Sequence, residues 1–204
     1  MKKYILLIIE MFLIILLAAM PVIAQVGQGG RDGRSMGPGM MGGRGMGMMG
    51  NPIASDVPDK LPIPRSPEWT QKLRDVLALE RLSYAQYTAD VKKFNAHMPY
   101  MMVIPQEEDH IRAIERLFNA FGLQADARPL AVTQTKTITE ALNVCVKLEK
   151  DLIPRYEWLV KNNGDLTSAG ILNEILLQTR YHLVMFEHAL RMGGSMGPGM
   201  MRGY

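Results

Sequence analysis

Apolar side chains recur every three to four residues in four long stretches of the chain, and no alternating pattern typical of a strand separates them. These stretches predict four helices, at residues 67–93, 99–121, 137–161 and 168–191. Ser66 provides an N-cap for the first helix, and Pro67 occupies its first position. Thr137 and Glu140 form a capping box at the start of the third helix, and Gly122 ends the second.

The lengths of the connections predict how the helices are arranged. The first and last connections take about five and six residues, whereas the middle one, residues 122–136, takes about fifteen. Short connections join antiparallel neighbours. A helix of about 22 residues is roughly 33 Å long, and fifteen extended residues reach roughly 50 Å, so the middle connection can run the length of a bundle. We expect an all-α fold, an antiparallel four-helix bundle with ferritin-like topology and one long crossover between the second and third helices.

Each predicted helix interrupts its apolar stripe with an ionisable side chain. The residues concerned are Glu80, Glu107, His110, Glu149 and His182. In an antiparallel pair, residues equally far from the turn lie at the same level. This places Glu149 beside His182, and it places Glu80 close to the level of Glu107 and His110. We therefore expect all of them near the middle of the bundle.

Ionisable groups in an apolar core need partners, because an unpaired buried charge costs several kcal/mol. Three carboxylates and two imidazoles in one core point to a shared cation of the hard-to-borderline class. The spacing of Glu107 and His110 puts two such ligands on one helix face. On the same helix, Glu108, Asp109 and Glu115 lie off the stripe and predict a solvated face. Taken singly, each buried residue also fits an ordinary interhelical salt bridge or a hydrogen-bonded core histidine.

Four short motifs in these helices resemble those of the ferritin-like di-iron carboxylate superfamily, in particular a little-characterised prokaryotic branch. They are Ala78-Leu79-Glu80, Glu107-x-x-His110-Ile111, Leu148-Glu149 and Thr179-Arg180-Tyr181-His182. The resemblance covers residues 68–192. It implies that Glu80, Glu107, His110, Glu149 and His182 hold a divalent metal, iron, as one or two ions, with Glu107 as the bridging carboxylate. If the protein is an enzyme, the resemblance implies oxidation chemistry with O2 or peroxide.

One position departs from the pattern of this superfamily. The complete motif carries a second glutamate where this chain has Thr179. The substitution leaves room for a single ion, an asymmetric pair of ions or a vestigial site. Four hydroxyl-bearing residues lie on nearly the same helix faces as the predicted ligands and could donate hydrogen bonds to them. They are Thr179, Tyr84, Tyr87 and Tyr181.

Residues 1–24 begin with Lys2 and Lys3, continue through an apolar run and end at Ala24, which is the form of a secretory signal peptide. We therefore expect the mature protein outside the cytoplasm, periplasmic or secreted. An uncleaved N-terminal membrane anchor is the alternative. The net charge of +3 gives no reason to expect a nucleic-acid partner. With Cys145 as the only cysteine, an intramolecular disulfide and a cysteine-cluster metal site are excluded.

Two Met/Gly-rich segments flank the predicted bundle of residues 66–192. Residues 25–65 end in an extended, proline-rich lead-in, and residues 193–204 form a tail in which the seven residues 35–41 recur unchanged. Thioether sulfur is a soft ligand that selects Cu(I). The candidate soft-metal ligands are Met36, Met40, Met41, Met46, Met48, Met49, Met196, Met200 and Met201.

Three functions follow from these observations. The first is an exported ferritin-like protein that binds iron or another divalent metal in its core. The second is a copper(I)- or silver-binding protein that acts through the Met-rich tails. The third is a structural or interaction module with a vestigial site. Metal ions are the expected partners, and a homo-oligomer is compatible with the sequence.

Overall fold

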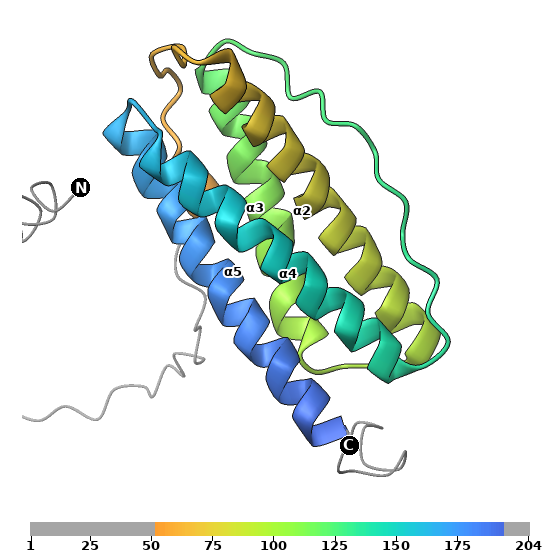
Figure 1. Cartoon of the computed structure of the whole chain (residues 1–204). Coiled ribbons are helices and arrows are strands. Elements are labelled where there is room, and N and C mark those ends of the chain that lie inside the picture. Colours follow the sequence, from red (N-terminus) through yellow and green to blue (C-terminus); the bar gives the residue numbers. More distant parts are fainter. Residues whose placement is uncertain (1–51, 194–204) are drawn as a thin grey trace, which may run out of the picture. The chain divides into compact units, whose positions relative to one another are not determined.

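The computed structural model describes residues 52–193, which form four α-helices and one short 3-10 helix (Figure 1). These are η1 (Ile53–Asp56), α2 (Pro67–Phe94), α3 (Tyr100–Ala120), α4 (Ile138–Lys161) and α5 (Leu166–Gly193). The described residues contain no strand. The predicted all-α fold is confirmed, and each α-helix begins and ends within two residues of its expected bounds.

The helix ends follow the predicted local chemistry. The Ser66 side chain accepts a hydrogen bond from the Trp69 N–H at 3.2 Å, and the Thr137 side chain accepts one from the Glu140 N–H at 3.1 Å. Beyond α3, Gly122 has a φ of +70°, which a residue without a Cβ adopts at little cost. These contacts satisfy backbone groups that have no partner within the helix.

The four helices form two antiparallel hairpins, α2 with α3 and α4 with α5, and α2 also packs against α4 (Figure 1). The connection between α3 and α4 runs along the outside of the bundle from one end to the other, so these two helices point in the same direction. This is the crossover predicted from the connection lengths. A bundle with one long crossover has ferritin-like topology.

The proline-rich lead-in is part of the core and is not simply extended. Ile53, Val57 and Leu61 are buried against the bundle. The Ile53 N–H donates a hydrogen bond of 2.6 Å to the Asp109 carboxylate, and the Leu61 N–H donates one of 2.8 Å to the Ala120 carbonyl. The expectation of a solvated Asp109 is therefore wrong: its side chain is buried because the lead-in covers that part of α3.

The apolar core consists of two clusters with a polar layer between them. Leu77 of α2 and Ile114 of α3 belong to one cluster, and Tyr87 of α2 and Val103 of α3 belong to the other. On every helix the predicted metal ligands lie between members of the two clusters. The fold thus holds a buried polar layer closed at both ends by apolar side chains.

Among residues 52–193, no helix combines the length and the apolar character that a membrane span requires. The predicted signal segment 1–24, the linker up to residue 51 and residues 194–204 lie outside the described residues. Every methionine named above as a soft-metal ligand falls in those parts of the chain.

Candidate metal centre

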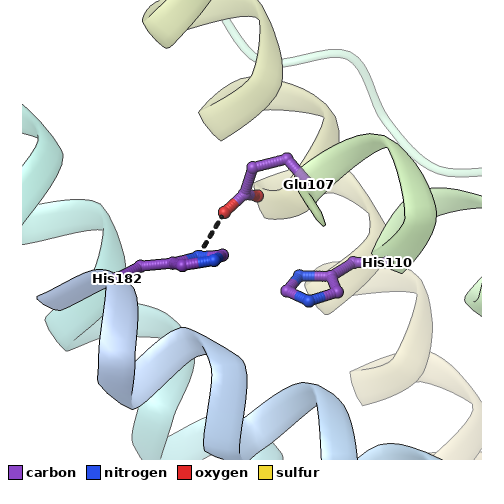
Figure 2. Close-up of side chains that lie close together, drawn as sticks. All are labelled: Glu107, His110 and His182. Atoms are coloured by element: carbon purple, nitrogen blue, oxygen red, sulfur yellow. Dashed lines mark ion pairs between the residues drawn. The ribbon is translucent and has the colours of Figure 1, made fainter. Parts of the chain in front are cut away.

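The five predicted ligands meet in the polar layer, and none of them has exposed surface. Glu80 comes from α2, Glu107 and His110 from α3, Glu149 from α4 and His182 from α5. Glu107, His110 and His182 each offer one ligand atom, and these three atoms lie within 4.8 Å of one another. Figure 2 shows the two side chains of α3 facing His182 across the bundle.

Both imidazoles present Nδ1 to the carboxylates. His182 Nδ1 lies 2.9 Å from Glu107 Oε1 and 3.7 Å from Glu149 Oε1, and His110 Nδ1 lies 3.4 Å from Glu80 Oε2. The two rings stack with their centroids 5.5 Å apart and their planes 24° from parallel. The site therefore consists of two carboxylate–imidazole pairs, one of which also contacts Glu107.

The outer nitrogen of each imidazole contacts a glutamine of the facing helix. His110 Nε2 lies 2.9 Å from Gln178 Oε1, and His182 Nε2 lies 2.9 Å from Gln106 Oε1. An amide oxygen only accepts hydrogen bonds, so each Nε2 carries the proton and donates it. For a neutral imidazole this leaves the lone pair on Nδ1, the atom that faces the carboxylates.

Two buried tyrosines hold the carboxylates from the other side. The Tyr87 hydroxyl of α2 donates a hydrogen bond of 2.6 Å to Glu149 of α4, and the Tyr156 hydroxyl of α4 donates one to Glu80 of α2. Neither tyrosine has exposed surface. Helix α2 therefore supplies the carboxylate of one carboxylate–imidazole pair and the phenol that supports the carboxylate of the other pair. Helix α4 does the same in return.

Of the residues predicted to donate hydrogen bonds to the ligands, some do so and others do not. Tyr87 does so, whereas the Thr179 hydroxyl, though buried, donates to the Ile175 carbonyl of its own helix at 2.9 Å. Tyr181, also predicted as a donor, is 53% exposed, whereas the ligands have no exposed surface. Tyr84 is half-buried.

Three supporting residues were not predicted as part of the site. They are Tyr156, Gln106 and Gln178. The sequence does contain a pattern that points to these supporting residues, because the same spacing between a supporting residue and a ligand occurs on two helices. A glutamine precedes a histidine by four residues on both α3 and α5, and a glutamate precedes a tyrosine by seven residues on both α2 and α4.

The site concentrates buried polar atoms that have no hydrogen-bond partner. Of ten such side-chain atoms among the described residues, six belong to the five predicted ligands. They are Glu80 Oε2, Glu107 Oε1 and Oε2, His110 Nδ1, Glu149 Oε2 and His182 Nδ1. Leaving a buried donor or acceptor unsatisfied costs about 1–3 kcal/mol, and more for a charged group. A cation bound by these atoms would satisfy them together, and carboxylate with imidazole is a donor set suited to iron, manganese and zinc.

Burial sets the protonation of the carboxyl groups. Burial, with the charges of Glu80 and Glu149 nearby, raises the pKa of Glu107 well above its ordinary value. Burial also raises the pKa of Glu149 well above its ordinary value, although the Tyr87 hydrogen bond opposes the change. Burial and the charge of His110 lower the pKa of His182 to about 3. Without a cation, burial therefore favours the neutral form of all three groups.

Glu80 and His110 form the one charged pair among the five ligands. Burial disfavours both charges, but their mutual attraction outweighs it, so the pKa of Glu80 is lowered and that of His110 is raised. A cation that binds all five side chains has to displace the protons held by Glu107, Glu149 and His110, so metal binding is coupled to proton release.

Comparisons with known proteins bear on the fold. No family model matches the sequence, and no curated protein matches it. The chain is similar to the crystal structure of a conserved hypothetical protein, rv2844, from Mycobacterium tuberculosis, with a TM-score of 0.53 and 15% identity over 63% of this chain and 92% of that one. It is also similar to a ferritin-like, diiron-carboxylate protein from Bacillus anthracis str. Ames, with a TM-score of 0.46 and 16% identity over 61% and 91%.

The ferritin-like fold implied by the sequence motifs is confirmed. The long crossover between α3 and α4 is the topological feature that identifies it. The buried Glu107, His110 and His182 cluster within this fold is compatible with metal binding.

The raised pKa values predict how the stability of the metal-free protein depends on pH. A group whose folded pKa exceeds its unfolded pKa contributes stability at low pH that is lost as the pH rises through the folded value. Glu107, Glu149 and His110 are such groups, and the opposing effect of His182 fades once the pH exceeds its unfolded pKa of about 6.5. The free energy of unfolding should therefore fall as the pH rises above about 7.5, by up to ~1.4 kcal/mol per pH unit for each proton retained.

Urea unfolding in the presence of a chelator measures this dependence. Glu107→Gln should flatten it, because the amide cannot ionise, whereas Glu108→Gln, on the exposed neighbour, should leave it unchanged. A stability that is constant or rises over this pH range would show that the buried carboxyl groups are not protonated in the folded chain.

Proposed function

We propose that this protein is an exported metal-binding protein whose helical core holds iron through Glu80, Glu107, His110, Glu149 and His182. The observation that carries the proposal is the convergence of three carboxylates and two imidazoles, all without exposed surface, whose Nδ1 and carboxylate oxygen atoms face one another. Glu107 Oε2 and Glu149 Oε2 have no hydrogen-bond partner, which a hydrogen-bonded structural network would supply.

The arrangement of the five residues favours two neighbouring positions for ions. Glu80 with His110 forms one carboxylate–imidazole pair, and Glu149 with His182 forms the other. Glu107 contacts His182 and interacts with Glu80, so it belongs to both pairs. Its position supports the role of bridging carboxylate that the sequence resemblance implied.

Bound iron would supply two neighbouring valence states and thereby oxidation chemistry with O2 or peroxide. The residues of this chain would set the conditions for that chemistry. Tyr87 and Tyr156 orient the two outer carboxylates, and the apolar clusters on both sides exclude water from the layer. Export follows from the predicted signal segment, residues 1–24.

Metal binding should raise the thermal stability of the chain, because a ligand that binds only the folded state stabilises it. At a free ion concentration of 100 times Kd, Fe(II), Mn(II) or Zn(II) should stabilise the protein by about 2.7 kcal/mol, which is a rise of roughly 5–10 °C in Tm. Glu107→Ala and His182→Ala should remove the shift.

Glu108→Ala is the matched control, since Glu108 is the exposed neighbour of Glu107 on the same helix, and it should keep the full shift. Absence of a shift with all three metals, or a full shift in Glu107→Ala, would contradict the proposal. Elemental analysis of protein purified without added metal identifies the resident ion, and we expect iron.

A second function, copper(I) binding by the Met-rich segments, is favoured by the seven residues 35–41 that recur at 195–201. Deleting residues 26–50 and 194–204 separates the two activities. Cu(I) binding, measured by competition with a chromophoric chelator, should be lost from the shortened chain, while the Fe(II)-induced rise in Tm should persist. Retention of Cu(I) binding would refute a role for these segments.

A further inference from the structure

A reciprocal pattern links α3 and α5 on the outer side of the metal centre. Gln106 and His110 lie four residues apart on α3, and Gln178 and His182 lie four residues apart on α5. Each histidine contacts the glutamine of the other helix, at 2.9 Å in both cases. With the imidazoles stacked between them, the four side chains form a closed brace across the two helices.

The two sides of the centre differ in their contact with solvent. Tyr87 and Tyr156, which support the carboxylates, have no exposed surface. Gln106 and Gln178 are half-buried. The glutamines are thus the supporting residues that reach solvent, and each is the hydrogen-bond partner of an imidazole that has no exposed surface.

The chemistry of the amide explains what the brace achieves. A neutral imidazole exists as two tautomers, and the nitrogen without the proton is the one that can bind a metal. An amide oxygen accepts the Nε2 proton and cannot return one, so it selects the tautomer whose Nδ1 is free. His182, whose Nδ1 lies 2.9 Å from Glu107, then directs its lone pair into the carboxylate layer.

We infer that Gln106 and Gln178 are positioning residues that fix Nδ1 as the ligand atom of His182 and His110, respectively. The inference deepens the proposed function and rests on it for its purpose, but the choice of tautomer is a property of the chain itself. Hydrogen-bond partners of this kind typically change metal affinity 10–100-fold when they are removed.

Nitrogen-15 NMR of histidine-labelled, metal-free protein near pH 7 tests the inference directly. In the wild type, neutral His182 should carry its proton on Nε2. Gln106→Leu should release this restraint and produce a mixture of the two tautomers, whereas Gln106→Glu, which keeps an acceptor oxygen in place, should retain the Nε2–H form. Gln71→Leu, on a glutamine of α2 that bonds Asp75, serves as the control and should change nothing.

Zinc affinity, measured on the full chain by competition with a chelator, provides the second measurement. Gln106→Leu and Gln178→Leu should weaken Zn(II) binding 10–100-fold, and the two glutamate variants should bind at least as tightly as the wild type. A packing role alone would not distinguish leucine from glutamate in this way.

The two measurements separate the inference from the proposed function. A proton on Nδ1 of His182 in the wild type, or a single unchanged tautomer in Gln106→Leu, overturns the inference whether or not zinc binds. The expected tautomers together with no binding of Zn(II), Fe(II) or Mn(II) by the wild type uphold the inference and overturn the proposed function.

Discussion

The burial of five ionisable side chains in one layer is the constraint on which this structure depends. Glu80, Glu107, His110, Glu149 and His182 have no exposed surface, so water cannot stabilise their charges. Burial raises the pKa values of Glu107 and Glu149, so protons and one internal ion pair reduce the charge of the layer in the metal-free chain. A divalent cation would replace those protons with a partner common to all five residues. Folding and metal binding are therefore linked through the same atoms.

The helices around the layer are organised in two similar pairs. On α2 and α4, the phenol of one helix supports the carboxylate of the other, and on α3 and α5 the amide of one supports the imidazole of the other. Glu107 breaks this correspondence, because the equivalent position on α5 holds Thr179, whose hydroxyl bonds its own helix. The centre thus has two matched pairs of ligands and a single central carboxylate.

The elements and the ligands could be predicted from the sequence, because both depend on local patterns. Helical periodicity and caps such as Thr137 locate the helices, and equal distances from a turn locate Glu149 beside His182. The supporting contacts could not be predicted in this way, since they depend on how each helix is rotated about its axis. Tyr156 and Gln178 find their partners on other helices, and Asp109 is buried only because the lead-in packs over it.

Anomalous diffraction at the iron absorption edge, from crystals of the full chain grown with Fe(II) under anaerobic conditions, tests the central claim most directly. The account predicts density for iron inside the bundle, bonded to Nδ1 of His110 or His182 and to the Glu107 carboxylate. An anomalous signal confined to the surface, or a core without signal whose five side chains hydrogen-bond only to one another, would contradict it.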